Sequence, residues 1–367
     1  MRNMIKDYHL RAIIAFFIIA LLASGCSDNG DSGTNDPEPE YDIYVDAVNG
    51  SNDNTGGKND PLRTITFAMT RALRGDTIKI APGNYDTTLG EIFPVTVPDN
   101  VTLIGDIDHK GEGTTPTVIT GVDSVDNENA ATLVAGASSY IAGLKIVQPG
   151  SIMRYYCVLS DGDNVTLSYN TFESQYGCLR LLGTEVAVVE YNHLSAPYYG
   201  IYSHNTGNTY IRYNQFLNGT YIEIADGHAV ITNNTFTGDS FRAISIQRGT
   251  SQITNNYITG SYFLSAMRFL NACSPKVRNN TIHVFSGDCI QILGTARPDL
   301  GTAADLGQNV FSGTSGVAVV TESPYIIQAI GNTWFHSSPI CGSEIVVNSS
   351  GSLAYGTGPG DTCYLVE

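Results

Sequence analysis

The chain has 367 residues, of which 42% are hydrophobic and 15% charged, so it holds enough apolar residues for a folded core. Its 19 basic and 35 acidic residues give a net charge of −16, which argues against DNA or RNA as a partner, because nucleic-acid binding depends on clustered Lys and Arg. The 38 glycines and 21 tyrosines favour short strands and tight turns, and hence an all-β fold.

Residues 1–25 are predicted to be a signal peptide. Basic residues precede an apolar run at 12–22, and the small residues at 23–25 lead to Cys26. Those 11 apolar residues reach only about 16 Å as a helix, against about 30 Å for a bilayer core. The ending resembles the bacterial lipobox, which implies cleavage after Gly25 and a lipid on Cys26. We therefore expect a lipid-anchored protein of the bacterial outer membrane or cell surface; an ordinary secretory signal is the alternative.

Residues 26–41 are predicted to be a flexible tether, because the stretch after Cys26 is polar and has no large apolar residue before Tyr41. Cleavage after Gly25 leaves 16 basic and 34 acidic residues, a net charge of −18. The remaining chain divides by pattern into an N-terminal cap with the first coils (42–105), a repeat region (106–340) and a C-terminal cap (341–367).

Two features are expected before the repeats. The loop with Asp46, Asn52, Asp53 and Asn54 offers oxygen ligands for calcium, but it lacks the spacing of a calcium loop, so a turn built on these side chains is the favoured interpretation. An amphipathic helix is then predicted, since apolar residues recur at helical intervals: Ile65, Ala68, Met69, Ala72 and Leu73. Gly75 is placed to stop this helix, and residues 76–80 alternate as the first strand.

The rest of the chain contains a repeat in which an asparagine is followed two residues later by a bulky apolar residue. Its members are Asn170/Phe172, Asn192/Leu194, Asn214/Phe216, Asn234/Phe236, Asn256/Ile258, Asn280/Ile282, Asn309/Phe311 and Asn332/Trp334. The spacings, mostly close to 22 residues, fit a β-solenoid of stacked coils. We interpret the asparagines as a structural ladder, in which each side-chain amide bonds to the next coil, and the helix as a cap on the open end.

Four segments that precede the repeats resemble those of a known family: YVDAVNGSNDNTGG (44–57), PLRTITFA (61–68), GDTIKIAPGNY (75–85) and FPVTVPDNVTLIG (93–105). With the repeats, they resemble pectate-lyase-like right-handed parallel β-helix proteins, and in particular a family of exported proteins of unknown function. The resemblance implies a right-handed coil. It is weak for activity, since the superfamily includes lyases, hydrolases, epimerases, adhesins and tailspikes.

Alignment of the strands predicts an outward column with one residue per coil: Arg180, Tyr202, Glu223, Ser245, Arg268 and Gln291. His204 and Gln247 lie two residues further along their strands and also point outward. Guanidinium, aromatic, carboxylate and imidazole groups in such a column suit an extended saccharide, although any solvated face carries similar residues.

Six cysteines follow Cys26, an even number that favours disulfides in an exported protein. Cys157 and Cys178 fall in one column on adjacent coils, Cys341 and Cys363 would close the C-terminal end, and Cys273 with Cys289 is the remaining pair. Free buried thiols are the alternative. A metal site is not expected, because no C-x-x-C or paired-histidine spacing occurs.

The residues of the outward column are compatible with two functions besides a purely structural one. The first is binding or adhesion, with a polysaccharide or surface glycan as partner and the membrane reached through the lipid on Cys26. The second is a polysaccharide lyase, epimerase or hydrolase acting on uronate glycans through Arg180, Tyr202, His204, Glu223 and Arg268. The residues depart from the motifs of such enzymes: Asp226-Gly227-His228 only partly resembles the hydrolase motif, and Tyr202 replaces the acid of the epimerase motif. These departures favour binding, and a purely structural role is the third possibility.

Overall fold

The computed structural model describes residues 40–150, 154–183, 185–358 and 360–364. By their contacts, Met1–Glu40 and Tyr41–Glu367 form separate units, and only the second is described below. The predicted signal peptide, Cys26 and the tether up to residue 39 lie outside the described residues. Within the described ranges, no helix is long and apolar enough to cross a membrane.

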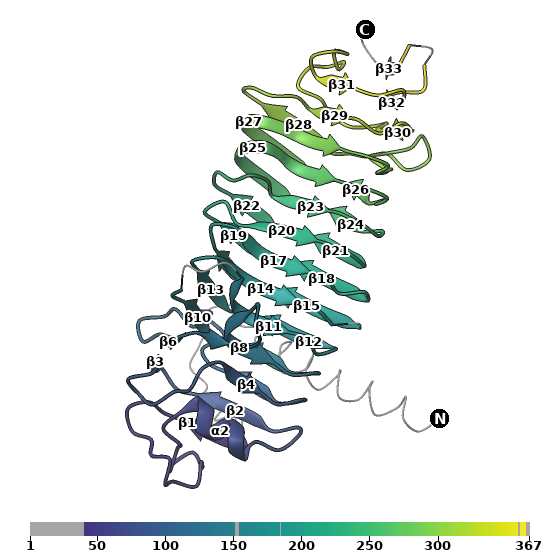
Figure 1. Ribbon diagram of the computed structural model, residues 1–367. Helices are drawn as coiled ribbons and strands as arrows, with labels where there is room; N and C mark the ends of the chain where they lie inside the picture. The colour runs from purple at the N-terminus through teal and green to yellow at the C-terminus, as the bar shows by residue number, and fades with distance from the viewer. Residues whose placement is uncertain (1–39, 151–153, 184, 359, 365–367) are drawn as a thin grey trace, which may run out of the picture. The chain divides into compact units, whose positions relative to one another are not determined.

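The unit is a stack of coils whose strands form three parallel sheets (Figure 1), which confirms the all-β solenoid. The first sheet contains β1 (Ile43–Val45), β2 (Thr77–Ile80), β5 (Thr102–Ile104), β9 (Tyr140–Ala142), β12 (Val165–Ser168), β15 (Val186–Glu190), β18 (Asn208–Arg212), β21 (His228–Thr232), β24 (Gln252–Thr254) and β26 (Lys276–Arg278). The second contains β3 (Gly83–Tyr85), β6 (Thr117–Thr120), β10 (Lys145–Gln148), β13 (Thr171–Ser174), β16 (His193–Ser195), β19 (Gln215–Leu217), β22 (Thr235–Thr237), the first parts of β25 (Tyr257–Phe269) and β27 (Thr281–Ile292), and β28 (Val310–Gly313).

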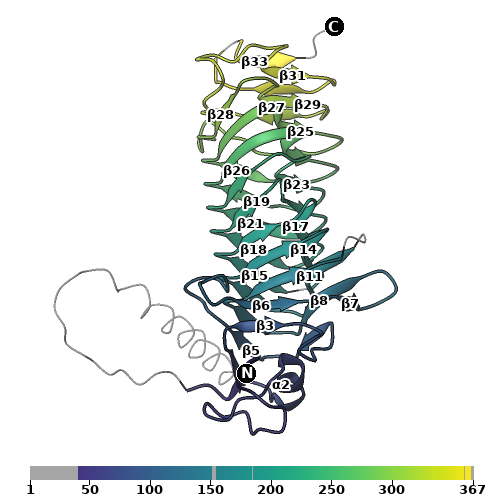
Figure 2. The same ribbon diagram turned by 90° about the vertical axis from the view of Figure 1, so that its left-hand side faces the viewer.

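The third sheet continues from the second through the long strands β25 and β27. It contains β4 (Val95–Val97), β8 (Ala130–Ala135), β11 (Tyr155–Ser160), β14 (Gly177–Leu181), β17 (Tyr199–Ser203), β20 (Tyr221–Ile224), β23 (Ile244–Ile246), the last parts of β25 and β27, β29 (Val319–Thr321) and β31 (Ile345–Val347). The short strand β7 (Asp123–Ser124) pairs antiparallel with β8. Near the C-terminus, β30 (Ile326–Gln328), β32 (Ser352–Ala354) and β33 (Thr362–Tyr364) form a three-stranded sheet. Figure 2 shows the stack from the side.

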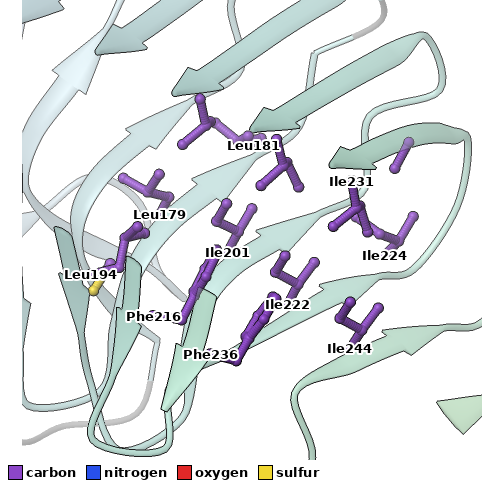
Figure 3. Close-up of a cluster of buried hydrophobic side chains, with 14 of the residues drawn as sticks. Leu179, Leu181, Leu194, Ile201, Phe216, Ile222, Ile224, Ile231, Phe236 and Ile244 are labelled. Atoms are coloured by element: carbon purple, nitrogen blue, oxygen red, sulfur yellow. The ribbon is translucent and has the colours of Figure 1, made fainter. Parts of the chain in front are cut away.

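The core runs along the stack because equivalent residues of successive coils occupy the same register. Phe172 is paired with Leu194, Leu194 with Phe216, and Phe216 with Phe236, and all four side chains are buried. The rings of Phe216 and Phe236 are parallel, with centroids 4.4 Å apart. Leucine and isoleucine side chains of the first and third sheets complete the interior (Figure 3). The apolar residue of each sequence repeat is therefore a core position.

The asparagines form the predicted ladder from Asn170 to Asn332. In each step, the Oδ1 atom of the next asparagine accepts bonds from the backbone N–H and the Nδ2 of the previous one, as Asn256 does from Asn234, both at 3.0 Å. Nδ2 also donates to a backbone carbonyl of the preceding coil, which for Asn234 is Ile211 at 2.9 Å. The residue before each ladder asparagine from 170 to 309 has a left-handed backbone, with φ between 54° and 57°.

The predicted helix exists as α2 (Ile65–Arg71), and its side chains Ile65, Ala68 and Met69 are buried in the core. Thr64 caps it by accepting a bond from the N–H of Phe67. The helix contacts β1 and β4 at the N-terminal end of the stack, where a cap was expected. It is shorter than its apolar pattern predicts: the backbone is extended at Ala72, and Leu73 is 72% exposed.

Only one of the three predicted disulfides is present. Cys341 and Cys363 are bonded, with Cα atoms 5.5 Å apart, whereas Cys157, Cys178, Cys273 and Cys289 are free and buried. The thiols of Cys157 and Cys178 instead point at backbone carbonyls, including that of Glu173 at 3.2 Å. Strand neighbours in one column have parallel Cβ bonds about 4.8 Å apart, wider than the roughly 3.8 Å between the Cβ atoms of a disulfide.

Cys273 and Cys289 were wrongly paired for a different reason. Cys273 lies four residues after the end of β25, whereas Cys289 lies within β27, between Asp288 and Ile290, which pair with Ser265 and Met267 of β25. The register places Cys289 beside Ala266, seven residues before Cys273 in the chain, so the two buried thiols do not face each other. Their burial, which is the largest cause, raises the pKa of both thiols, that of Cys273 to about 12.

Candidate functional site

The predicted outward column exists on the third sheet. The strand pairing aligns Arg180 with Tyr202, Tyr202 with Glu223, Glu223 with Ser245, Ser245 with Arg268, and Arg268 with Gln291. Tyr199 pairs with Tyr221 and Ile201 with Ile222, so β17 has one residue more than β20 at this point. A bulge between Tyr199 and Ile201 accommodates the extra residue, and the alignment continues. We call the aligned residues the outward column.

The column differs from the prediction in its exposure. Glu223 is only 4% exposed and Ser245 is fully buried, although both face away from the core. Glu223 accepts a bond from Gln247 Nε2 at 2.5 Å, and its other oxygen lies 3.6 Å from Arg242 Nη1. The guanidinium of Arg242 also lies 3.5 Å from the hydroxyl of Ser245. Long neighbouring side chains therefore cover the middle of the column, while His204 stands exposed beside it.

Three arginines gather on this sheet. Arg180 lies between two aromatic rings, 5.8 Å from the centroid of Tyr156 and 5.6 Å from that of Tyr202, and Arg242 lies 5.5 Å from that of Tyr221. Burial, reinforced by the charge of Arg242, lowers the pKa of Arg268. The Nε atoms of Arg180, Arg242 and Arg268 are buried and have no hydrogen-bond partner among the described residues.

Tyrosines surround the arginines at the N-terminal side of the column. Tyr199 contacts Tyr176, Tyr202 and Tyr221, with ring centroids 5.8, 5.4 and 5.0 Å apart. Tyr156 is 2% exposed, and burial is the largest cause that raises the pKa of its phenol. The same holds for the pKa of Tyr221, which is raised first by burial and then by Tyr199.

A second column, missed by the sequence reasoning, lies where the chain passes from the second sheet to the third. It consists of the exposed rings of Tyr198, Phe241, Phe263 and Phe285, with exposures of 44%, 47%, 79% and 49%. The rings of Phe241 and Phe263 touch edge to face, with centroids 5.6 Å apart. We call these residues the aromatic edge. Phe241, Phe263 and Phe285 recur at intervals of 22 residues, which was a detectable signal in the sequence.

In the loop considered for calcium, the side-chain oxygens of Asp46 and Asn52 accept hydrogen bonds from backbone N–H groups. Asp46 Oδ1 accepts bonds from the N–H groups of Val48 (2.8 Å) and Asn49 (3.0 Å). Asn52 Oδ1 accepts bonds from Arg63 N and Thr64 N, both at 3.1 Å. Across the described ranges, no three His, Cys, Asp or Glu side chains are grouped as metal ligands.

Comparisons with known proteins address the fold. The family model "Protein of unknown function (DUF1565)" matches residues 48–208, and "Right handed beta helix region" matches residues 199–357. No curated protein matches the sequence. Among solved structures, the GH136 lacto-N-biosidase from Eubacterium ramulus is similar, with 11% identity, a TM-score of 0.50, and coverage of 85% of this chain and 68% of that one.

Two further solved structures are similar to the chain. The carrot pectin methylesterase has 14% identity and a TM-score of 0.41, with coverage of 86% of this chain and 90% of that one. Escherichia coli YbhC has 12% identity and a TM-score of 0.43, with coverage of 66% and 77%. Identities this low concern the fold and not the activity. The two family models together span residues 48–357 and confirm the predicted right-handed β-helix, and residues 48–208 are similar to a family of unknown function.

Proposed function

We propose that the protein binds polysaccharide along the third sheet. One observation carries this proposal: three guanidinium groups, those of Arg180, Arg242 and Arg268, lie along a single sheet, and those of Arg180 and Arg242 lie over tyrosine rings. The guanidinium fork suits carboxylate or sulfate groups, so the proposed ligand is an anionic glycan.

The aromatic edge supports the same ligand class. Pyranose rings present apolar C–H faces, and these pack on the electron-rich faces of aromatic rings. Successive coils are about 4.8 Å apart, which is close to the length of one sugar unit, so an extended glycan can follow the stack. Phe241, Phe263 and Phe285 offer one ring per coil on the flank of the arginines.

The carboxylate of the column has a positioning role in this proposal. Glu223 already bonds Gln247 and lies beside Arg242, so it holds Arg242 in place over Ser245. A glycosidase works with two carboxyl groups on either side of the scissile bond, and Glu223 is the single acid of the outward column. This favours binding over a glycosidase that draws both of its carboxyl groups from the outward column.

The test is retention of the protein on immobilised polygalacturonate, alginate, hyaluronate and a neutral glucan. We expect retention on at least one anionic glycan, and its loss in Arg242→Ala and Arg268→Ala. Arg212→Ala is the matched control, because Arg212 forms a surface ion pair with Glu190 on the first sheet. Retention by none of the glycans, or equal retention of all variants, would overturn the proposal. Appearance of shortened or unsaturated products would make the protein an enzyme.

We further propose export and anchoring through a lipid on Cys26. The support is the sequence of residues 1–26, whose apolar run ends in small residues before the cysteine. Expressed in a bacterial host, the protein is expected in the membrane fraction with an acylated N-terminal peptide in mass spectrometry. Cys26→Ser should move it to the soluble fraction, and a membrane location unchanged by this substitution would contradict the anchor.

A further inference from the structure

The N-terminal end of the outward column meets a hairpin. Residues 121–131 leave the stack, and β7 returns antiparallel to the start of β8, with Asp123 paired to Ala131. In Figure 2 the hairpin projects on the side of the stack where β11 and β14 are labelled. At its tip, Asp126 Oδ1 accepts bonds from the N–H groups of Glu128 and Asn129, both at 2.7 Å.

Side-chain contacts hold this hairpin against the column. Asn129 is 7% exposed, and its Nδ2 donates a hydrogen bond to the carboxylate of Asp126. Its Oδ1 accepts a hydrogen bond from Arg180, the first arginine of the column. Glu128 forms an ion pair with Arg154, one residue before β11. The two contacts link the hairpin to residues that follow it in the chain by 26 and by 51 positions. They therefore fix the hairpin to the two coils beyond β8.

The outward position of the coil beside the hairpin is covered. Leu159 occupies the outward position of β11, directly before Arg180 in the register, yet it is only 4% exposed. Tyr156 of the same strand is 2% exposed. In the other direction the column continues through Arg268 and Gln291 to Val320 and Val346, which are all partly exposed. Beyond Leu159 the next outward positions are Val134, which is partly exposed, and Thr96, which is exposed, so Leu159 and the hairpin separate them from the column that begins at Arg180.

We infer that the third sheet recognises the end of a glycan chain and not its interior, because the hairpin 121–131 stops a ligand at Arg180. This inference rests on the proposed function and specifies its ligand as the terminal units of an anionic saccharide. The last sugar would meet Arg180 together with Tyr202, and the following units would run toward Arg268. A chain longer than this face extends past the C-terminal coils and gains no further contact with the arginines.

The experiment compares intact polygalacturonate, alginate and hyaluronate with short fragments of each, as soluble competitors of retention at equal mass of sugar. Chain-end recognition predicts that fragments compete better than polymer by the ratio of their chain ends per gram. Equal competition by polymer and fragments would overturn the inference while leaving the proposed function intact. Competition by neither form would overturn the proposed function, and the inference with it.

Two variants test the hairpin itself. Replacement of residues 123–128 by Gly-Gly should raise competition by intact polymer toward that of the fragments, because an internal stretch of chain could then pass Arg180. Asn129→Ala, which frees the hairpin from Arg180 without shortening it, should shift the ratio in the same direction. Unfolding midpoints show that both variants fold. A polymer-to-fragment ratio unchanged in two folded variants would refute the hairpin as the stop.

Discussion

Replacing Asn234 by leucine tests the ladder on which the stack depends. Asn234 is 1% exposed, and leucine keeps its branched shape while removing every polar atom of the side chain. The backbone N–H of Asn214 donates to Asn234 Oδ1 at 3.0 Å, so the substitution leaves a buried donor unpaired at a cost of about 1–3 kcal/mol. The lost bonds to Ile211 and Asn256 add about 1 kcal/mol, so we expect a total of about 3 kcal/mol.

Urea unfolding of wild type and Asn234→Leu measures this cost. Circular dichroism reports the whole stack, and fluorescence reports the last coils, since Trp334 is the single tryptophan and packs 5.1 Å from Phe311. In a solenoid each coil contacts only its neighbours, so a difference between the two transitions would show local unfolding. Asn208→Ala, at an exposed asparagine of β18, is the control and should change stability by less than about 0.5 kcal/mol. Equal midpoints for Asn234→Leu and wild type would refute the ladder as a stabilising element.

Two further predictions concern the ends of the stack. The Cys341–Cys363 bond closes a loop of sequence separation 22, so replacing both cysteines by serine should destabilise the C-terminal coils by about 3 kcal/mol, seen as earlier proteolysis near Trp334; unchanged cleavage would contradict this. Burial is the largest cause that raises the pKa of Glu91, which accepts bonds from the N–H groups of Ile65 and Thr66 at the start of α2. A raised pKa in the folded state means that its contribution is full below the ordinary value of 4.5 and is lost as pH rises through the raised value. Wild type should therefore lose stability relative to Glu91→Gln as pH rises from below 4.5, and the opposite slope in paired urea titrations would refute this.

The sequence by itself determined the architecture, because every coil repeats the same pattern of an asparagine and an apolar residue. The asparagine and the apolar residue two positions later gave the period, the ladder and the core column of Phe172, Leu194, Phe216 and Phe236. The outward column also followed from the sequence, since in-register parallel pairing converts equal positions in successive repeats into neighbours. The cap helix was predicted from its period, although its last turn was not.

Only the tertiary structure decided which groups meet across coils and turns. Arg242 lies in a turn outside the strand alignment, so its ion pair with Glu223 and its place over Tyr221 were not predictable from the repeat. The contact of Asn129 with Arg180 spans 51 residues and depends on a hairpin that belongs to no repeat. The free thiols of Cys157 and Cys178 show the same limit: the column was right, but Cβ spacing and direction decide whether a bond forms. Periodicity fixes positions along the stack, whereas side-chain direction and irregular turns fix the chemistry on its surface.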